Sequence, residues 1–215
     1  PGGLGVATVL SCGLFSAISG SSVATAATIG TVAIPEMTQR GYSRPFVLGL
    51  LAAGGTLGIL IPPSIPLILY GVITETSIPT LFLAGVGPGL FLAAVFIVYS
   101  MLYAKFSGEF TPEPKASWSE RKRASLMALP TIFLAAAVIG SIYMGIATPS
   151  ESAGVGFVLA LIMTSLMGRM SINKVKEAVY DSMKTTTMIF LIIAGAKVFS
   201  YAITLYRIPQ NISDL

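Results

Sequence analysis

The sequence has no histidine and only one cysteine, Cys12, among its 215 residues. Without histidine it cannot form histidine-ligated metal or haem sites, Ser-His or Cys-His nucleophile pairs, or the usual proton relay near neutral pH. A lone cysteine cannot form a disulfide within the chain, and on an apolar segment it is expected to be a small buried hydrophobe. These absences argue against an enzyme, and no cofactor is expected.

Charged residues are also scarce, at 10% of the chain, where soluble domains carry about 25%. Hydrophobic residues make up 54%, and the mean hydropathy is +0.83. The sequence therefore predicts an all-α polytopic protein of the lipid bilayer. The net charge of +4 does not indicate a nucleic-acid partner, because the basic residues flank apolar segments.

The first apolar run, from Pro1 to Pro35, contains no charged residue. As one straight helix it would be about 50 Å long, well beyond the roughly 30 Å of bilayer hydrocarbon. We expect the helix to break at the small polar cluster of residues 19–22, which leaves two arms too short to span comfortably. Residues 1–38 are therefore predicted to form a re-entrant helical hairpin with its tip near the membrane midplane. Non-helical backbone at that depth marks a candidate binding site.

A second charge-free run extends from Pro45 to Thr74. Pro62, Pro63 and Pro66 lie within it, and prolines both lack an amide donor and clash with the preceding turn of a helix. Residues 45–74 are therefore predicted to form a broken transmembrane helix.

The rest of the chain predicts about four further crossings. Thr148, Pro149 and Glu151 match a capping box at the start of one helix. The expected pieces are a transmembrane helix at 81–104, a cytoplasmic loop and interfacial helix at 105–127, two transmembrane helices at 128–168, an amphipathic arm and transmembrane helix at 172–206, and a periplasmic tail at 207–215.

The placement of positive charge supports this layout. If residues 39–44 lie inside and the segments alternate from there, every basic residue except Lys197 and Arg207 falls on that side. The loops on the other side, 75–80 and 147–152, contain no basic residue. By the positive-inside rule the basic side is cytoplasmic, and the first segment must enter and leave on that side, as a hairpin does.

Several motifs resemble the large membrane subunit of tripartite ATP-independent periplasmic (TRAP) transporters, the DctM-like family. They are long and follow one another in the family's order, with Ser150 and Ser152 as mild departures. The similar segments are 19–30 (SGSSVATAATIG), 34–37 (IPEM), 40–42 (RGY), 53–64 (AGGTLGILIPPS) and 145–153 (GIATPSESA).

The resemblance implies the permease subunit of a sodium-coupled secondary transporter in the bacterial or archaeal cytoplasmic (inner) membrane. Such a subunit imports organic acids delivered by a periplasmic binding protein, and it pairs with a small membrane subunit. Its fold is an inverted-repeat elevator type. Scaffold helices before Pro1 and a second hairpin after Leu215 are therefore expected.

The resemblance also implies a site between the hairpin tip and the broken helix. An uncharged sodium site can use carbonyl oxygens freed where a helix unwinds, and the helix N-terminus after the tip favours a carboxylate. The expected sodium-binding residues are Ser19, Gly20, Ser22, Gly58, Ile61 and Pro63. The expected substrate-binding residues are Ser21, Ser22, Thr25, Gly55 and Thr56.

Other interpretations stay open at this point. A sodium/dicarboxylate or citrate symporter that needs no binding protein has a similar hairpin architecture, a channel is a different class, and small-residue clusters can simply let helices pack closely. Lys197 lies near the middle of the last crossing, where a cation is costly. It could contact carbonyls or missing helices, or it could have a functional role, including that of the base in a Ser-Lys protease.

Overall fold

A computed structural model of the chain describes residues 2–107, 117–168 and 170–206, without the side chains of residues 120 and 121. The described residues form helices joined by turns, which confirms the predicted all-α class. The chain divides into two compact units, residues 1–160 and 161–215. In order, α1 to α8 span Gly3–Ser19, Ser22–Gln39, Arg44–Leu60, Ile65–Thr74, Ile78–Ser107, Trp118–Tyr143, Pro149–Leu166 and Ile172–Leu205.

Five described segments are long and apolar enough to cross a membrane, which agrees with one broken helix and four further crossings. The protein is therefore a multi-pass membrane protein. The segments are Arg44–Thr74, Ile78–Ser107, Lys122–Tyr143, Pro149–Leu166 and Ile172–Leu205.

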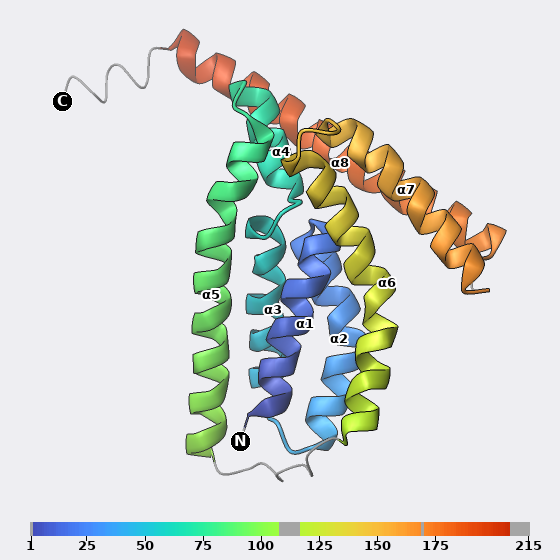
Figure 1. Ribbon diagram of the computed structural model, residues 1–215. Coiled ribbons are helices and arrows are strands. Elements are labelled where there is room, and N and C mark those ends of the chain that lie inside the picture. Colours follow the sequence, from blue (N-terminus) through green and yellow to red (C-terminus); the bar gives the residue numbers. More distant parts are fainter. Residues whose placement is uncertain (1, 108–116, 169, 207–215) are drawn as a thin grey trace. The chain divides into compact units, whose positions relative to one another are not determined.

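The predicted break in the first apolar run lies between α1 and α2. Gly20 ends α1 in the left-handed conformation, with φ 58° and ψ 14°, and its amide donates to the Ser16 carbonyl at 3.0 Å. Ser21 is the N-cap of α2, because its hydroxyl accepts from the Ala24 amide at 3.3 Å. The two helices run antiparallel and are in contact, so their outer ends lie at the same end of the first unit (Figure 1).

The predicted break in the second run lies between α3 and α4. The Ile61 amide closes the last turn of α3 by donating to the Leu57 carbonyl at 2.8 Å. Helical structure resumes only at Ile65, after two prolines that cannot donate. In Figure 1 the tip of the α1–α2 hairpin lies beside this break, and α4 continues beyond the tip.

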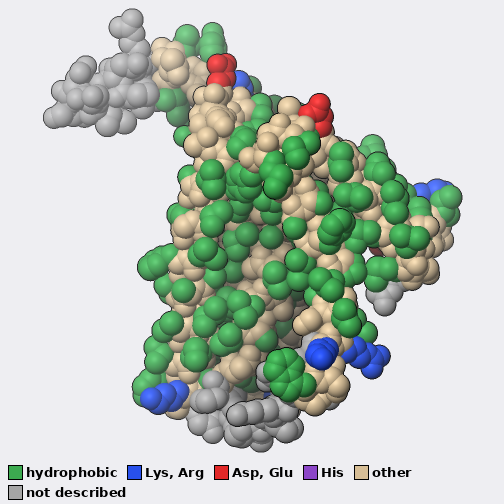
Figure 2. Space-filling model, in the orientation of Figure 1, with side chains coloured by type: hydrophobic (Ala, Val, Ile, Leu, Met, Phe, Trp, Pro, Cys, Tyr) green, Lys and Arg blue, Asp and Glu red, His purple; other side chains and the backbone are tan. Residues whose placement is uncertain are grey.

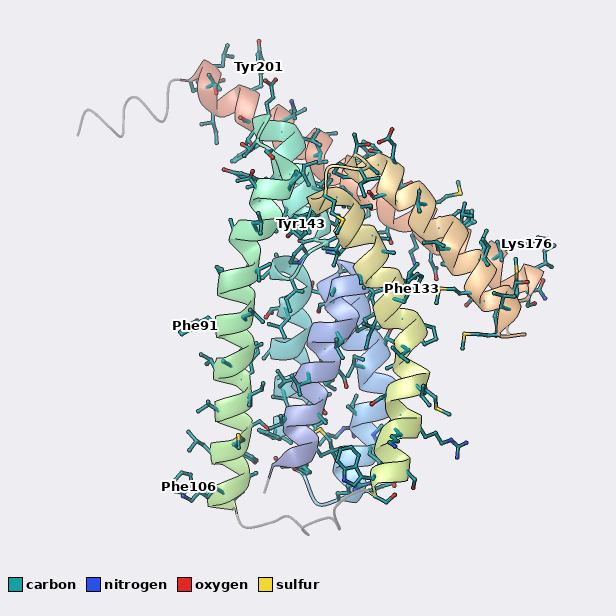
Figure 3. The ribbon with its side chains drawn as sticks, viewed as in Figure 1. Phe91, Phe106, Phe133, Tyr143, Lys176 and Tyr201 are labelled. Carbon is teal, nitrogen blue, oxygen red and sulfur yellow. The ribbon has the colours of Figure 1, made fainter. Side chains whose placement is uncertain are left out.

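The core of the first unit lies among α1, α2 and α3, with α5 packed against it. Elsewhere many large apolar side chains face outward: Phe91 is 72% and Phe106 79% exposed, and both point away from α5 in Figure 3. Figure 2 shows apolar side chains over much of the visible surface. An apolar exterior of this kind suits a bilayer. The buried core includes Val9, Cys12, Met37, Val47, Leu50 and Leu57.

Two expected boundaries do not appear as breaks in the helices. The interfacial helix and the crossing expected on either side of residue 128 are one helix, α6, which continues through Pro130. The amphipathic arm and the crossing expected within 172–206 are also one helix, α8. The stretches 124–129 and 181–186 contain neither glycine nor proline, so nothing local interrupts the hydrogen-bond ladder. Residues 108–116 of the expected loop and the expected tail at 207–215 lie outside the described residues.

Candidate functional site

The hairpin tip is joined to the broken helix by a backbone hydrogen bond. The Ile65 amide at the start of α4 donates to the Gly20 carbonyl at 3.3 Å. A Cβ atom on Gly20 would lie 2.6 Å from the Pro63 carbonyl oxygen, which is closer than real Cβ contacts come. Glycine is therefore required at position 20 both by its positive φ and by its neighbour.

Two glycines of α3 extend this contact. A Cβ on Gly58 would lie 2.8 Å from the Ser21 carbonyl carbon and 2.9 Å from the Ser22 amide nitrogen. A Cβ on Gly55 would lie 2.9 Å from the Ser22 carbonyl oxygen. The structure thus brings together predicted site residues from both broken segments, more than 30 positions apart in the sequence.

The prolines of the break release backbone carbonyls from the helical ladder. In a continuing helix the carbonyls of Gly58 and Ile59 would accept from residues 62 and 63, but both are prolines without an amide hydrogen. Ser64 compensates one of them, because its buried hydroxyl donates to the Ile59 carbonyl at 2.6 Å. The Gly58 carbonyl also loses its helical donor, in a residue that packs against the tip, and unwound helices supply such oxygens to cations.

Four helix ends meet at this junction (Figure 1). Helices α1 and α3 end there with their carbonyl ends, and α2 and α4 begin there with their amide ends. The carbonyl ends have partial negative charge and suit a cation, whereas the amide ends have partial positive charge and suit a carboxylate. Neither broken segment contains a charged residue within 1–35 or 45–74. The site can therefore attract both kinds of ion without a fixed protein charge.

Hydroxyl groups on α1 and α2 form hydrogen bonds that stabilise the hairpin tip. The Thr25 hydroxyl is buried and donates to the Ser21 carbonyl at 2.8 Å. It also lies 3.1 Å from the Ser19 hydroxyl and 3.4 Å from that of the buried Ser16. These bonds tie the end of α1 to the start of α2 and fix the shape of the turn.

Two predicted site residues have side chains that do not take part in the tip contact. The Ile61 backbone belongs to the break, but its side chain faces α5 and α1, where it would be 3.1 Å from a Cβ placed on Gly89 and 3.7 Å from one placed on Gly13. The Thr56 side chain is exposed, and its hydroxyl donates to the Ala53 carbonyl of its own helix at 2.6 Å. Their assignments as sodium- and substrate-binding residues stay predictions, as do those of the residues at the tip.

Two contributors were missing from the sequence-based site, Ser64 and Gly85. The Ser64 hydroxyl donates to the Ile59 carbonyl, and the position of Ser64 directly after two prolines could have indicated this role from the sequence. Gly85 of α5 allows close approach to the break, because a Cβ there would lie 2.6 Å from the Leu60 carbonyl oxygen. Its signal was the small-residue motif at 85–89, Gly-Val-Gly-Pro-Gly.

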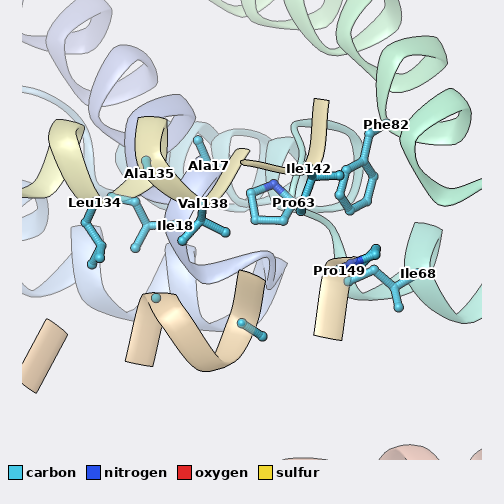
Figure 4. A pocket seen from close by; sticks show the side chains of 12 residues that line it. Ala17, Ile18, Pro63, Ile68, Phe82, Leu134, Ala135, Val138, Ile142 and Pro149 are labelled. Carbon is cyan, nitrogen blue, oxygen red and sulfur yellow. The ribbon is translucent and has the colours of Figure 1, made fainter. Parts of the chain in front are cut away.

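An apolar cavity of about 250 Å³ adjoins the tip within the first unit. Ala17, Ile18 and Pro63 line it near the tip, and side chains of α6, including Val138 and Ile142, form another wall (Figure 4). Its lining residues carry no charge. None of these side chains has a hydrogen-bonding group either, so the tip and break, with their free helix ends, remain the candidate site.

Comparison with known proteins gives a family and a set of relatives. Residues 1–215 match the family described as Tripartite ATP-independent periplasmic transporter, DctM component. The ectoine/5-hydroxyectoine TRAP transporter large permease protein UehC of Ruegeria pomeroyi is 38% identical over 98% of this chain and 49% of its own length.

Two further relatives have different solutes in their names. The C4-dicarboxylate TRAP transporter large permease protein DctM of Pseudomonas aeruginosa is 39% identical over 99% of this chain and 50% of its own length. The sialic acid TRAP transporter large permease protein SiaM of Vibrio cholerae is 35% identical over 99% of this chain and 50% of its own length. The chain spans about half the length of these curated relatives.

Proposed function

The chain belongs to the DctM family of tripartite ATP-independent periplasmic transporters, and on that premise we propose that it forms part of the permease of a sodium-coupled importer of organic acids. The family consists of transport proteins rather than enzymes. In this proposal a periplasmic binding protein delivers the solute and a small membrane subunit completes the permease in the cytoplasmic (inner) membrane. The α1–α2 hairpin is re-entrant, and the chain supplies one repeat of an inverted-repeat elevator.

The observation that carries the proposal is the junction of four helix ends at the hairpin tip. Sodium takes several oxygen ligands, and the break removes the helical donor of the Gly58 carbonyl, in a residue whose Cα packs against the tip residues Ser21 and Ser22. The amide ends of α2 and α4 at the same place favour the carboxylate of a solute. A bound sodium ion and a bound carboxylate would attract each other, which couples their binding without a buried charged side chain.

The solute class rests on the relatives and on the neutral site. Relatives of 35–39% identity are named for a C4-dicarboxylate and for sialic acid, and one of 38% is named for ectoine. Similar identities to relatives named for different solutes are compatible with a site in this chain that recognises a feature common to those solutes. We propose that this feature is the carboxylate, and that the remainder of the solute is selected outside the tip.

Uptake by the complete transporter tests the proposal. The complete permease, with its small subunit and binding protein, is reconstituted in proteoliposomes, and uptake of labelled solute is measured with a sodium or a choline gradient. The solute panel is ectoine, a C4-dicarboxylate and sialic acid. We expect saturable uptake of one organic acid with the sodium gradient alone. Equal uptake with choline would refute sodium coupling, and steady unitary currents would indicate a channel.

Matched variants locate the site within the same assay. Ser22→Leu places a bulky group at the tip and is expected to abolish sodium-dependent uptake. Gly49→Leu, on the exposed face of α3 with nothing within 4 Å of a Cβ, should preserve it. Size-exclusion chromatography checks that both permeases assemble. Unchanged sodium dependence in Ser22→Leu would show that the tip is not the site.

A further inference from the structure

Basic side chains gather at one end of the first unit. Arg44 begins α3, Lys105 lies in the last turn of α5, and Lys122 and Arg123 lie near the start of α6; all four side chains are exposed. Figure 1 shows these three helix ends at the same end of the unit. Glu36 at this end is already paired with Arg40, one helical turn away.

Side-chain contacts join the start of α3, where Arg44 lies, to the end of α5, where Lys105 lies. The Ser43 hydroxyl, next to Arg44, lies 2.9 Å from the Tyr103 hydroxyl of α5. The Phe46 ring stacks on Tyr103 with centroids 3.9 Å apart and planes 6° apart. These contacts fix the start of α3 against the end of α5, and they place Arg44 and Lys105 on adjoining parts of one surface.

A helix dipole adds to the positive charge at Arg44. Arg44 is the first residue of α3, whose first turn contains no acidic residue, so a cation stands at the positive end of a helix. Such a position is unfavourable for a cation by itself, and an external anion beside Arg44 would relieve the repulsion. Lys122 and Arg123 lie beyond the first turn of α6, so they contribute to this end through their side-chain charges alone.

Large aromatic side chains lie exposed beside these cations in the sequence. Phe106 follows Lys105 and is 79% exposed, and Trp118 at the start of α6 is 76% exposed. In a membrane protein, aromatic rings near the ends of crossings lie at the depth of the lipid headgroups. The aromatic side chains thus indicate that the nearby cations lie beside headgroups rather than in bulk water.

We propose that this basic aromatic end binds the phosphate groups of anionic phospholipids, such as phosphatidylglycerol, in the leaflet that surrounds it. The basic aromatic end consists of Arg44, Lys105, Phe106, Trp118, Lys122 and Arg123. Charge complementarity selects the lipid, because a zwitterionic headgroup supplies no net negative charge to the four cations. The inference does not depend on transport or on the ion and solute bound at the hairpin tip.

The single tryptophan of the chain reports directly on this surface. Trp118 lies within the basic aromatic end and is the only tryptophan present. The full chain is reconstituted in two sets of phosphatidylcholine vesicles. One set contains a minor fraction of brominated phosphatidylglycerol and the other the same fraction of brominated phosphatidylcholine. In both lipids the bromine atoms lie near the headgroup end of one acyl chain. Bromine quenches tryptophan fluorescence on contact, so quenching at equal lipid fractions measures enrichment beside Trp118.

We expect brominated phosphatidylglycerol to be enriched at least about threefold over brominated phosphatidylcholine at low salt. The preference should disappear in about 1 M salt, where the Debye length falls to about 3 Å. The variant Arg44→Gln/Lys105→Gln/Lys122→Gln/Arg123→Gln should quench equally with both lipids. The exchange variant Arg44→Lys/Lys105→Arg/Lys122→Arg/Arg123→Lys keeps every charge and should keep the preference.

Circular dichroism establishes that both variants are folded. Equal quenching of the parent chain by the two brominated lipids would overturn the proposal, and so would a preference that survives removal of the four charges or that is unaffected by salt. If the neutral variant does not fold, the parent chain with its salt series and the exchange variant still decide the outcome.

Discussion

Gly58 illustrates how the candidate site depends on the absence of a side chain. It lies in the last turn of α3, and its Cα is so close to the hairpin tip that a Cβ would come within 2.9 Å of three backbone atoms. Backbone atoms cannot turn aside as the end of a flexible side chain can. The close contact between α3 and the hairpin tip therefore requires a residue without a Cβ atom at position 58.

Gly58→Ala should therefore lower stability by about 1–3 kcal/mol, because the added methyl group must push the tip away from α3. Gly49→Ala is the matched control in the same helix, since nothing lies within 4 Å of its Cβ. The control should gain stability by up to about 1 kcal/mol from the better helix propensity of alanine. Thermal unfolding in detergent measures both. Equal stability of the two variants would contradict the tight contact.

Ser64→Ala tests the hydroxyl that replaces a missing amide. The substitution leaves the Ile59 carbonyl without its 2.6 Å partner at a fully buried position, so we expect a loss of about 1–3 kcal/mol. Thr31→Ala removes a similar bond to the Thr28 carbonyl on an exposed face and should change stability by less than about 0.5 kcal/mol. Chemical unfolding of the two variants compares them directly. A loss no greater than that of the control would show that the Ile59 carbonyl finds another donor.

At the scale of helices, caps decide where segments begin and end. The predicted capping box at α7 is confirmed: the Thr148 amide and hydroxyl both donate to the same Glu151 carboxylate oxygen at 2.8 Å, and the Glu151 amide approaches the Thr148 hydroxyl at 3.4 Å. This gives Glu151 a role in ending the turn between α6 and α7. The Ser141 and Ser152 hydroxyls, 2.9 Å apart, link the two helices beyond it.

Glu151→Ala should lower stability by about 1 kcal/mol, because it removes the acceptor for the Thr148 amide. Glu151→Gln is the matched control, since a glutamine can also complete a capping box. The control should retain most of the stability in a thermal unfolding series. A loss of equal size in both variants would mean that the negative charge near the helix N-terminus matters, rather than the hydrogen bonds.

At the scale of the first unit, the exposed basic side chains of Arg44 and Lys122 lie at one end, together with Glu36 and its partner Arg40. The exposed Glu75 follows the end of α4 and the exposed Glu151 lies in the first turn of α7, both at the other end (Figure 1). This distribution of basic residues agrees with a layout in which the basic end is cytoplasmic. It also places both outer ends of the hairpin at the basic end.

Cysteine labelling tests that topology. In a Cys12→Ala background, single cysteines replace Arg44, Lys122, Glu75 or Glu151, and intact cells are treated with a membrane-impermeant maleimide. We expect labelling at positions 75 and 151 in intact cells, and at positions 44 and 122 only after permeabilisation. Labelling of 44 and 75 from the same side would contradict a membrane crossing by the broken helix.

The sequence by itself determined the membrane class and the positions of both breaks. These follow from local chemistry, because apolar runs need lipid, prolines lack an amide hydrogen, and the Ser-Gly-Ser-Ser cluster supplies both a C-cap glycine and an N-cap serine. The family resemblance then indicated which residues should meet. It did not give the continuity of α6 and α8, because polar residues followed by apolar ones do not interrupt a helix.

Only the tertiary structure decided which backbone atoms touch at the tip. The pairing of the Ile65 amide with the Gly20 carbonyl joins residues 45 positions apart, and no local propensity encodes such a contact. Packing also turned Ile61 toward α5, left Thr56 exposed and brought Gly85 to the break. The physical reason is that helix breaks arise from the residues at the break, such as prolines without an amide hydrogen and serines that cap a helix. The direction of each side chain depends instead on how several helices pack together.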